Sequence, residues 1–186
     1  GHVTGQSLFV DDLPEISGTL FAVPVPSPIA CGKILKMDLS AALAVPGVER
    51  IITAADIPGE NQIGTIIPDE PLLAALNINS SVHLKSEIFC EVHFTGQPIA
   101  LVIARSERAA RKARNLIRIE YKEEVPVTDA RHAQQLGHLL VPPRTFRLGN
   151  TEQAWEQCRY VFEGRADSGG QEHVYLETQG AYAWMT

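Results

Sequence analysis

The sequence has no long apolar run, no excess of positive charge and no visible signal peptide. No stretch approaches the roughly 18 apolar residues of a membrane-spanning helix. The net charge is −6, from 22 acidic and 16 basic residues, and the absence of a long basic run disfavours a nucleic-acid-binding protein. The first residue is Gly1 rather than Met, so we expect a processed, tagged or excised fragment.

Cysteines are few and isolated. Cys31, Cys90 and Cys158 are far apart and contain no C-x-x-C pair. They therefore encode neither a zinc knuckle nor an iron–sulfur cluster. Isolated cysteines are typical of a reduced protein, and we predict a cytoplasmic location.

The common catalytic motifs are also missing. The six histidines include no H-E-x-x-H motif, and G-x-S-x-G, P-loop and G-x-G-x-x-G motifs are absent. Acyl transfer, phosphate-loop binding and dinucleotide binding therefore have no supporting residues. Asp11 and Asp12 could bind a cation, but their position before Pro14 favours ordinary turn residues.

What the sequence does contain is a strand–helix–strand unit at residues 96–121. Residues 98–104 (PIALVIA) are nearly all apolar, as in a strand buried on both faces. Ser106 is expected to cap the next helix, and an alternating strand starts at Ile117. If the two strands pair in parallel, the crossover is right-handed. The apolar helix face comprises Ala109, Ala110, Ala113, Leu116 and Ile117.

A second unit of the same kind spans residues 29–53. Asp38 or Ser40 is expected to cap a helix at 41–45, which Pro46-Gly47 ends. A strand follows at 48–53. The chain has 186 residues, of which 45% are hydrophobic, and this is enough to form a buried hydrophobic core. We predict an α+β fold with two strand–helix–strand units on a mixed sheet.

The remaining segments are predicted less regularly. Residues 60–91 form a long connection, which is usually functional or mobile; it contains a weak helix at 71–76 and leads into a strand at 88–94. A short strand is predicted at 20–25, and its prolines limit it to the edge or the end of a sheet. Helices are predicted at 131–140 and at 151–158, the second capped by Asn150 with Trp155 on its buried side. Further strands are predicted at 159–165 and 180–185.

Residues 169–178 (GGQEHVYLET) have the composition of a binding site. Gly169 and Gly170 allow the backbone to approach a ligand closely. The amide of Gln171 is both a donor and an acceptor. Titratable groups follow at Glu172, His173, Tyr175 and Glu177. An ordinary glycine-rich loop before a strand is the alternative interpretation.

This segment resembles G-G-Q-E-H-(aromatic)-Y-L-E-T of the molybdenum-binding subunit in the xanthine dehydrogenase and aldehyde oxidase (molybdenum hydroxylase) family. Upstream stretches resemble the family in the same order across nearly the whole chain: GQSLFVDD at 5–12, SPIACGK at 27–33 with Met37-Asp38, PGV at 46–48, TAADIPG at 53–59 and GQPIA at 96–100.

The resemblance implies an α/β hammerhead domain followed by the start of a molybdenum-cofactor domain. It places the hammerhead core at 1–121, a connecting excursion at 122–165 and the truncated cofactor domain at 166–186. In this family, molybdenum held by a pterin dithiolene hydroxylates a heterocycle or aldehyde with oxygen from water. Electrons leave through 2Fe-2S clusters, usually to FAD, on partner modules or subunits.

The resemblance also assigns roles to residues. Gln171 is implied to donate an amide hydrogen bond to an oxo ligand of molybdenum, with Gly169 and Gly170 admitting the cofactor. Val174 stands where xanthine-type members often carry an aromatic residue. The family's catalytic glutamate lies far downstream, so no catalytic residue is expected within these residues and the fragment alone is predicted to be inactive.

An alternative function is a non-catalytic α+β scaffold that docks another subunit through its sheet and the 60–91 connection. The two hypotheses differ at Gln171. Replacing Gln171 lowers turnover if it faces the metal and changes little if it is a loop residue. A small-ligand site in the 60–91 connection has no residues that favour it.

Overall fold

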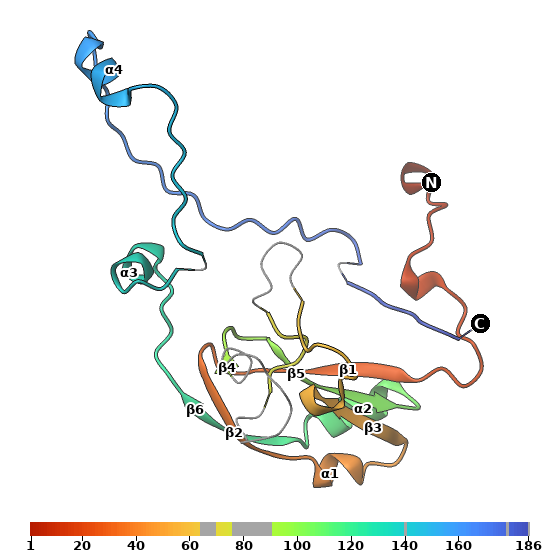
Figure 1. The fold of residues 1–186 in the computed structure, drawn as a ribbon. Coiled ribbons are helices and arrows are strands. Elements are labelled where there is room, and N and C mark those ends of the chain that lie inside the picture. Colours follow the sequence, from red (N-terminus) through yellow and green to blue (C-terminus); the bar gives the residue numbers. More distant parts are fainter. Residues whose placement is uncertain (64–69, 76–90, 140, 178, 186) are drawn as a thin grey trace. The chain divides into compact units, whose positions relative to one another are not determined.

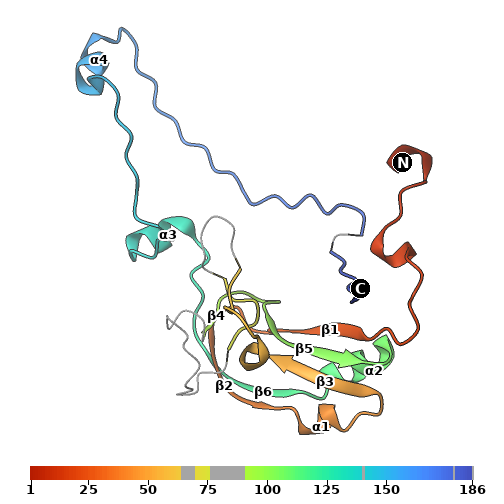
Figure 2. The same ribbon diagram turned by 45° about the vertical axis from the view of Figure 1, so that its right-hand side comes forward.

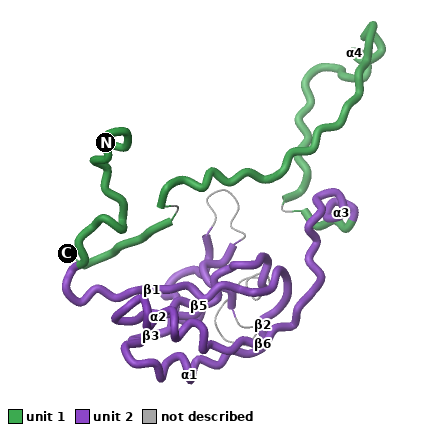
Figure 3. Tube along the Cα trace, turned by 180° about the vertical axis from the view of Figure 1, so that it is seen from behind, with its two compact units in different colours: residues 1–15, 136–186 green, residues 16–135 purple. Residues whose placement is uncertain are grey.

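The computed structural model describes residues 1–63, 70–75, 91–139, 141–177 and 179–185 (Figure 1). The chain divides into two compact units (Figure 3). We call Ile16–Gln135 the sheet unit, and Gly1–Glu15 with Leu136–Thr186 the terminal unit. The sheet unit contains β1 (Phe21–Pro26), β2 (Gly32–Asp38), α1 (Ser40–Leu43), β3 (Val48–Thr53), η3 (Ala54–Asp56), β4 (Glu91–Val92), β5 (Pro98–Ala104), α2 (Glu107–Arg114), β6 (Arg118–Glu123) and α3 (Ala130–Gln135); the terminal unit contains η1 (His2–Thr4), η2 (Val10–Asp12) and α4 (Thr151–Gln157).

β5 is the central strand of the first sheet, whose order is β1-β5-β3 (Figure 2). Both neighbours pair with it in antiparallel register. Ile99, Val102 and Ala104 are inaccessible to solvent, which confirms the buried strand expected from the apolar run. β1 lies at the edge of this sheet, where Pro24 is tolerated because an edge strand has backbone groups that need no sheet partner.

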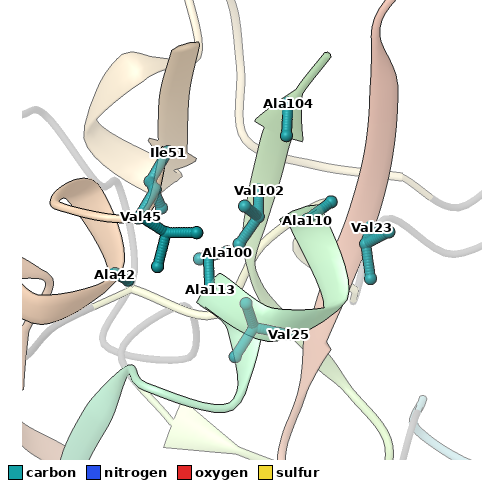
Figure 4. Close-up of a cluster of buried hydrophobic side chains, with 10 residues drawn as sticks. All are labelled: Val23, Val25, Ala42, Val45, Ile51, Ala100, Val102, Ala104, Ala110 and Ala113. Atoms are coloured by element: carbon teal, nitrogen blue, oxygen red, sulfur yellow. The ribbon is translucent and has the colours of Figure 1, made fainter. Parts of the chain in front are cut away.

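Helix α2 packs closely on this sheet through its alanines. The Ser106 hydroxyl oxygen accepts a hydrogen bond from the amide of Ala109 at 3.2 Å, which confirms the predicted cap. Ala110 and Ala113 are completely buried in a cluster with side chains of β1, β3 and β5 (Figure 4). Their small side chains let the helix backbone approach the sheet.

The second sheet has the order β4-β2-β6, with β2 antiparallel to both neighbours. Ile34 of β2 and Val92 of β4 are fully buried, together with Ile99 of β5. Ile99 therefore extends the apolar surface of the first sheet into the core of the second. The two cores share one partly buried side chain, Ile119 of β6.

Gly32, at the start of β2, occupies a position that excludes other residues. Its φ is +146°, a conformation that L side chains rarely adopt. A Cβ atom there would collide with the backbone oxygen of Lys122 and lie 3.0 Å from Cα of Glu123, both on the paired strand β6. The glycine of the SPIACGK stretch is thus required for the close pairing of β2 with β6.

The α+β class is confirmed, but the sheet arrangement differs from the single mixed sheet that we predicted. β5 and β6 do not pair; they belong to different sheets, and every strand pairing in the described ranges is antiparallel. The reason is that β1 and β3 occupy both edges of β5, so β6 pairs with β2 instead.

The connection after η3 also differs from expectation. Residues 71–75 form no helix. The backbone amide of Leu73 donates to Oδ1 of Asn61 at 3.0 Å, and its carbonyl accepts from Nδ2 of Asn61 at 2.7 Å. These groups are therefore bonded to a side chain rather than to a helical turn. Leu76 and residues 88–90 lie outside the described residues, and the predicted strand at 88–94 is a strand at Glu91–Val92.

The terminal unit has less regular structure than predicted. α4 confirms the helix predicted there, and Oδ1 of Asn150 accepts from the amide of Gln153 at 3.0 Å as expected for the cap. The other predicted helix, at 131–140, is α3 (Ala130–Gln135) at the end of the sheet unit. Trp155, however, is 59% exposed rather than buried. Residues 159–165 and 180–185 are not strands, because no described segment of the unit supplies a backbone partner for them.

Candidate functional site

The glycine–glutamine segment, residues 169–177, is irregular up to a turn at Leu176 and Glu177. Nearly all of its side chains are exposed, including that of Gln171. Two local hydrogen bonds are weak: the hydroxyl of Ser168 donates to the carbonyl of Gly169 at 3.4 Å, and the amide of Val174 donates to Oε1 of Glu172 at 3.4 Å. A third joins two side chains, since Nε2 of Gln179 donates to the hydroxyl of Tyr175 at 2.9 Å. The segment is therefore held by contacts at its end rather than by its own backbone.

Gly169 and Gly170 have no packing requirement among the described residues. A Cβ atom at either position would meet no atom within 4 Å, and neither residue has a positive φ. The predicted role of the two glycines, close approach of backbone to a cofactor, thus stays a prediction.

Gln171 offers the chemistry that the predicted role needs. In the described part of the chain, its side chain makes no hydrogen bond, and the residue is exposed. A primary amide provides two N–H donors and one oxygen acceptor. This donor set fits an anionic oxygen of a bound group, such as the oxo ligand that the resemblance implies.

Two residues of the segment have backbone angles that are unusual for side chains of their size. Val174 has a φ of +45° and Glu177 a φ of +71°. A positive φ is an outlier for a β-branched residue such as valine. Such conformations persist where surrounding contacts determine them and are frequent in functional segments.

The carboxylate of Glu177 provides one such contact. Its Oε1 accepts hydrogen bonds from the backbone amides of Val10 at 2.6 Å and Asp11 at 3.2 Å. These are the first amides of η2, which a short helical turn leaves without internal partners. Oδ2 of Asp12 accepts from the amide of Phe9 at 3.0 Å, so the turn interpretation of Asp11-Asp12 is confirmed.

No protein-built metal centre is evident. Within the described ranges, no three His, Cys, Asp or Glu side chains gather in a geometry that could hold a metal ion. A metal at this segment would therefore need ligands beyond these side chains, as a pterin-held metal has.

The other motif residues stabilise the sheet unit. Ser27 is buried; its amide donates to the carbonyl of Gln97, and its carbonyl accepts from the amide of Gly96, each at 2.8 Å. The SPIACGK and GQPIA stretches are thus joined directly. Oε1 of Gln97 in turn accepts from the amide of His93 at 2.7 Å.

The TAADIPG stretch contains a second structural carboxylate. Oδ2 of Asp56 accepts from the amide and the hydroxyl of Thr53, each at 2.9 Å. Nη2 of Arg50 donates to Oδ1 of Asp56 at 2.8 Å. The amide of Thr53, followed by the Arg50 and Thr53 side chains, lowers the pKa of Asp56 because each stabilises its charged form.

Two family profiles match successive parts of the chain. The family profile "Aldehyde oxidase and xanthine dehydrogenase, a/b hammerhead domain" matches residues 4–125, and the profile "Molybdopterin cofactor-binding domain" matches residues 131–186. Aldehyde oxidase 2 from Cavia porcellus is 38% identical over 180 residues, which cover 96% of this chain and 12% of that protein. Xanthine dehydrogenase from Drosophila pseudoobscura pseudoobscura is 34% identical over 185 residues, covering 98% of this chain and 13% of that protein.

Solved structures show the same fold. Quinoline 2-oxidoreductase from Pseudomonas putida 86 matches with a TM-score of 0.56 at 29% identity, covering 72% of this chain and 16% of that chain. Reconstituted CO dehydrogenase from Oligotropha carboxidovorans matches with a TM-score of 0.56 at 29% identity, covering 71% of this chain and 15% of that chain.

The fold and these matches define a hammerhead domain followed by residues that match a molybdopterin cofactor-binding domain. The chain belongs to the aldehyde oxidase and xanthine dehydrogenase family. It spans 12–13% of the length of the two curated relatives named above. No helix in the described part of the chain is long and apolar enough to cross a membrane.

Sequence reasoning missed the role of Glu177. The residue was noted only as a titratable group, because its partners lie 166 and 167 positions earlier in the chain. No local pattern reports so distant a contact. The joint presence of GQSLFVDD and GGQEHVYLET in one chain was the only signal that could have suggested it.

Proposed function

We propose that this chain is part of a molybdenum-cofactor-dependent hydroxylase that acts on a heterocycle or an aldehyde with oxygen from water. The observation that supports this most directly is the match of a hammerhead profile and a molybdopterin-domain profile in series along one chain. In this proposal, 1–121 is the hammerhead core, 122–165 connects, and 166–186 begins the cofactor domain.

The cofactor, when bound, would supply the redox chemistry of the hydroxylation. The role proposed for this chain is to bind and orient it: Gln171 would donate its amide hydrogen bond to an oxygen of the cofactor, and Gly169 and Gly170 would admit it. The exposed, unbonded amide of Gln171 supports this assignment, because no described contact competes for it.

We further propose that electrons leave through 2Fe-2S and FAD modules, on the same polypeptide or on partner subunits. A reduced, cytoplasmic setting is proposed because the three cysteines of the sequence are isolated and include no C-x-x-C pair. The catalytic base and the substrate pocket belong, in this proposal, to parts of the enzyme outside this chain.

The decisive experiment measures molybdenum and iron in the full-length protein purified with its natural partners from cells able to make the cofactor. We expect molybdenum near one atom per large subunit, with iron alongside. Absence of molybdenum would contradict the proposal and favour the scaffold alternative.

Gln171→Ala in the full-length protein tests the site itself. Loss of one preorganised hydrogen-bond donor to a charged oxygen costs on the order of 10²–10³ in turnover. We expect a decrease of this kind in kcat with partner assembly retained. Gln157→Ala, an exposed glutamine at the end of α4, is the matched control and should leave kcat unchanged. Equal kcat in both variants would contradict the assignment.

A further inference from the structure

Glu177 lies among the few partly buried residues of the terminal unit. Among the described residues of this unit, those that are not fully exposed are Ser7, Phe9, Val10, Glu177 and Tyr182. All come from two short segments, 7–10 and 177–182. The unit is thus tied together at one place, where the N-terminal segment meets the end of the glycine–glutamine segment (Figure 3).

The contact is built from an ionised side chain and backbone donors. Oε1 of Glu177 accepts from the amides of Val10 at 2.6 Å and Asp11 at 3.2 Å. Hydrogen bonds in which the acceptor is charged are shorter and about twice as strong as neutral ones. The first turn of η2 also places its positive dipole end at this carboxylate, although in so short a helix the effect is small.

Packing around the carboxylate is close. A Cβ atom on Gly180 would lie 3.2 Å from Oε1 of Glu177 and 3.2 Å from Cβ of Val10. A side chain at position 180 would therefore require the Glu177 carboxylate or the Val10 side chain to shift by a few tenths of an ångström. The φ of +71° at Glu177 itself shows that the backbone accepts an unfavourable conformation in the same place.

We propose that Glu177 is a positioning residue: by binding the backbone of Val10 and Asp11, it fixes the glycine–glutamine segment against the N-terminal segment and thereby sets the position of Gln171. The second part of this inference rests on the function proposed above, whereas the contact itself does not. Gln171 precedes Glu177 by six positions, and the one hydrogen bond of the intervening backbone to another described residue is the weak local bond at Val174. The orientation of Gln171 therefore depends on where Glu177 is anchored.

The test compares Glu177→Ala, Glu177→Gln and Gly180→Ala with the control Glu163→Ala, each in the full-length holoenzyme. Glu163 is an exposed glutamate of the same unit. The first measurement is backbone hydrogen exchange in the peptide covering residues 5–15. We expect exchange about tenfold to a hundredfold faster in Glu177→Ala, because a hydrogen bond to a charged group is lost. Glu177→Gln, which keeps an acceptor oxygen, should fall between Glu177→Ala and the wild type.

The second measurement is turnover per bound molybdenum, together with the electron paramagnetic resonance spectrum of the metal. Misplacement of a positioned group by about 1 Å can lower the rate about a hundredfold. We expect kcat per molybdenum to fall in Glu177→Ala with a smaller change in KM, the metal spectrum to change, and Glu177→Gln to recover part of the activity. Gly180→Ala should cause the same changes to a lesser degree, which keeps the test informative if Glu177→Ala fails to fold.

Unchanged exchange at residues 5–15 in Glu177→Ala would overturn the inference outright. Faster exchange with normal kcat per molybdenum and an unaltered metal spectrum would overturn the positioning role and leave a structural contact only. If the wild-type protein contains no molybdenum, the proposed function fails and the positioning role fails with it. The exchange measurement would still decide separately whether Glu177 holds the N-terminal segment.

Discussion

The sheet unit and the terminal unit differ in the interactions that stabilise them. In the sheet unit, the strands pair in two antiparallel sheets, and buried apolar side chains form two clusters. In the terminal unit, long stretches are extended and exposed, and a single carboxylate makes the main long-range contact. One unit is stabilised by burial and the other by a few specific polar bonds.

This difference predicts in which unit a change of side-chain volume should affect stability. Apolar burial contributes about 25 cal/mol per Å², so changes in volume within the clusters affect the whole sheet unit. The terminal unit exposes large apolar side chains such as Phe146 and Phe162, and its stability within this chain should be insensitive to such changes. The following predictions test that difference, from the largest effect to the smallest.

Gly32→Ala should destabilise the sheet unit most. The new Cβ would collide with the backbone of β6, and the positive φ would be strained in addition. We expect a loss of about 2–5 kcal/mol in the free energy of unfolding, measured by urea denaturation of the chain. Gly59→Ala is the control, since a Cβ there meets nothing within 4 Å; equal losses in both variants would contradict the collision.

Ala113→Leu should cost about 1–3 kcal/mol, because the side chain is fully buried between α2 and the first sheet and the larger group overpacks the cluster. Ala154→Leu makes the same change on the exposed helix α4 of the terminal unit. We expect no loss there. The shift of the urea midpoint from the wild-type value is compared between the two variants. An equal loss of stability in Ala154→Leu would contradict the expected difference between the units.

Asp56→Asn should give the smallest effect, and one that depends on pH. The pKa of Asp56 is lowered below its usual value of 3.8 by the hydrogen bonds from Thr53 and Arg50. The charged form therefore stabilises the folded state above about pH 4, and this stabilisation is lost as the pH falls through the folded pKa. We expect the wild-type advantage in the free energy of unfolding, measured by urea denaturation, to be about 0.5–1 kcal/mol at pH 7 and to shrink at pH 3. If the stability difference between the wild type and Asp56→Asn were the same at pH 3 and pH 7, the charge of the Asp56 carboxylate would not be its cause.

Several features were determined by the sequence alone. The apolar period identified β5, the helix α2 and β6; the caps at Ser106 and Asn150 were confirmed; and the ordered motifs identified the family. These are local signals, because a cap or an amphipathic period depends on residues a few positions apart. The prediction of a site at Gln171, which came from resemblance, is a prediction still.

Other features were decided only by the tertiary structure. The pairing of the strands could not be predicted from the sequence, because the same strand–helix–strand pattern arises whether or not β5 and β6 share a sheet. In the structure, β1 and β3 occupy both edges of β5, so β6 belongs to the other sheet. The burial of Trp155 was predicted wrongly because amphipathic spacing does not say whether a partner surface exists. The bond from Glu177 to the backbone of Val10 joins residues 167 positions apart, and only the folded chain brings such groups within hydrogen-bonding distance.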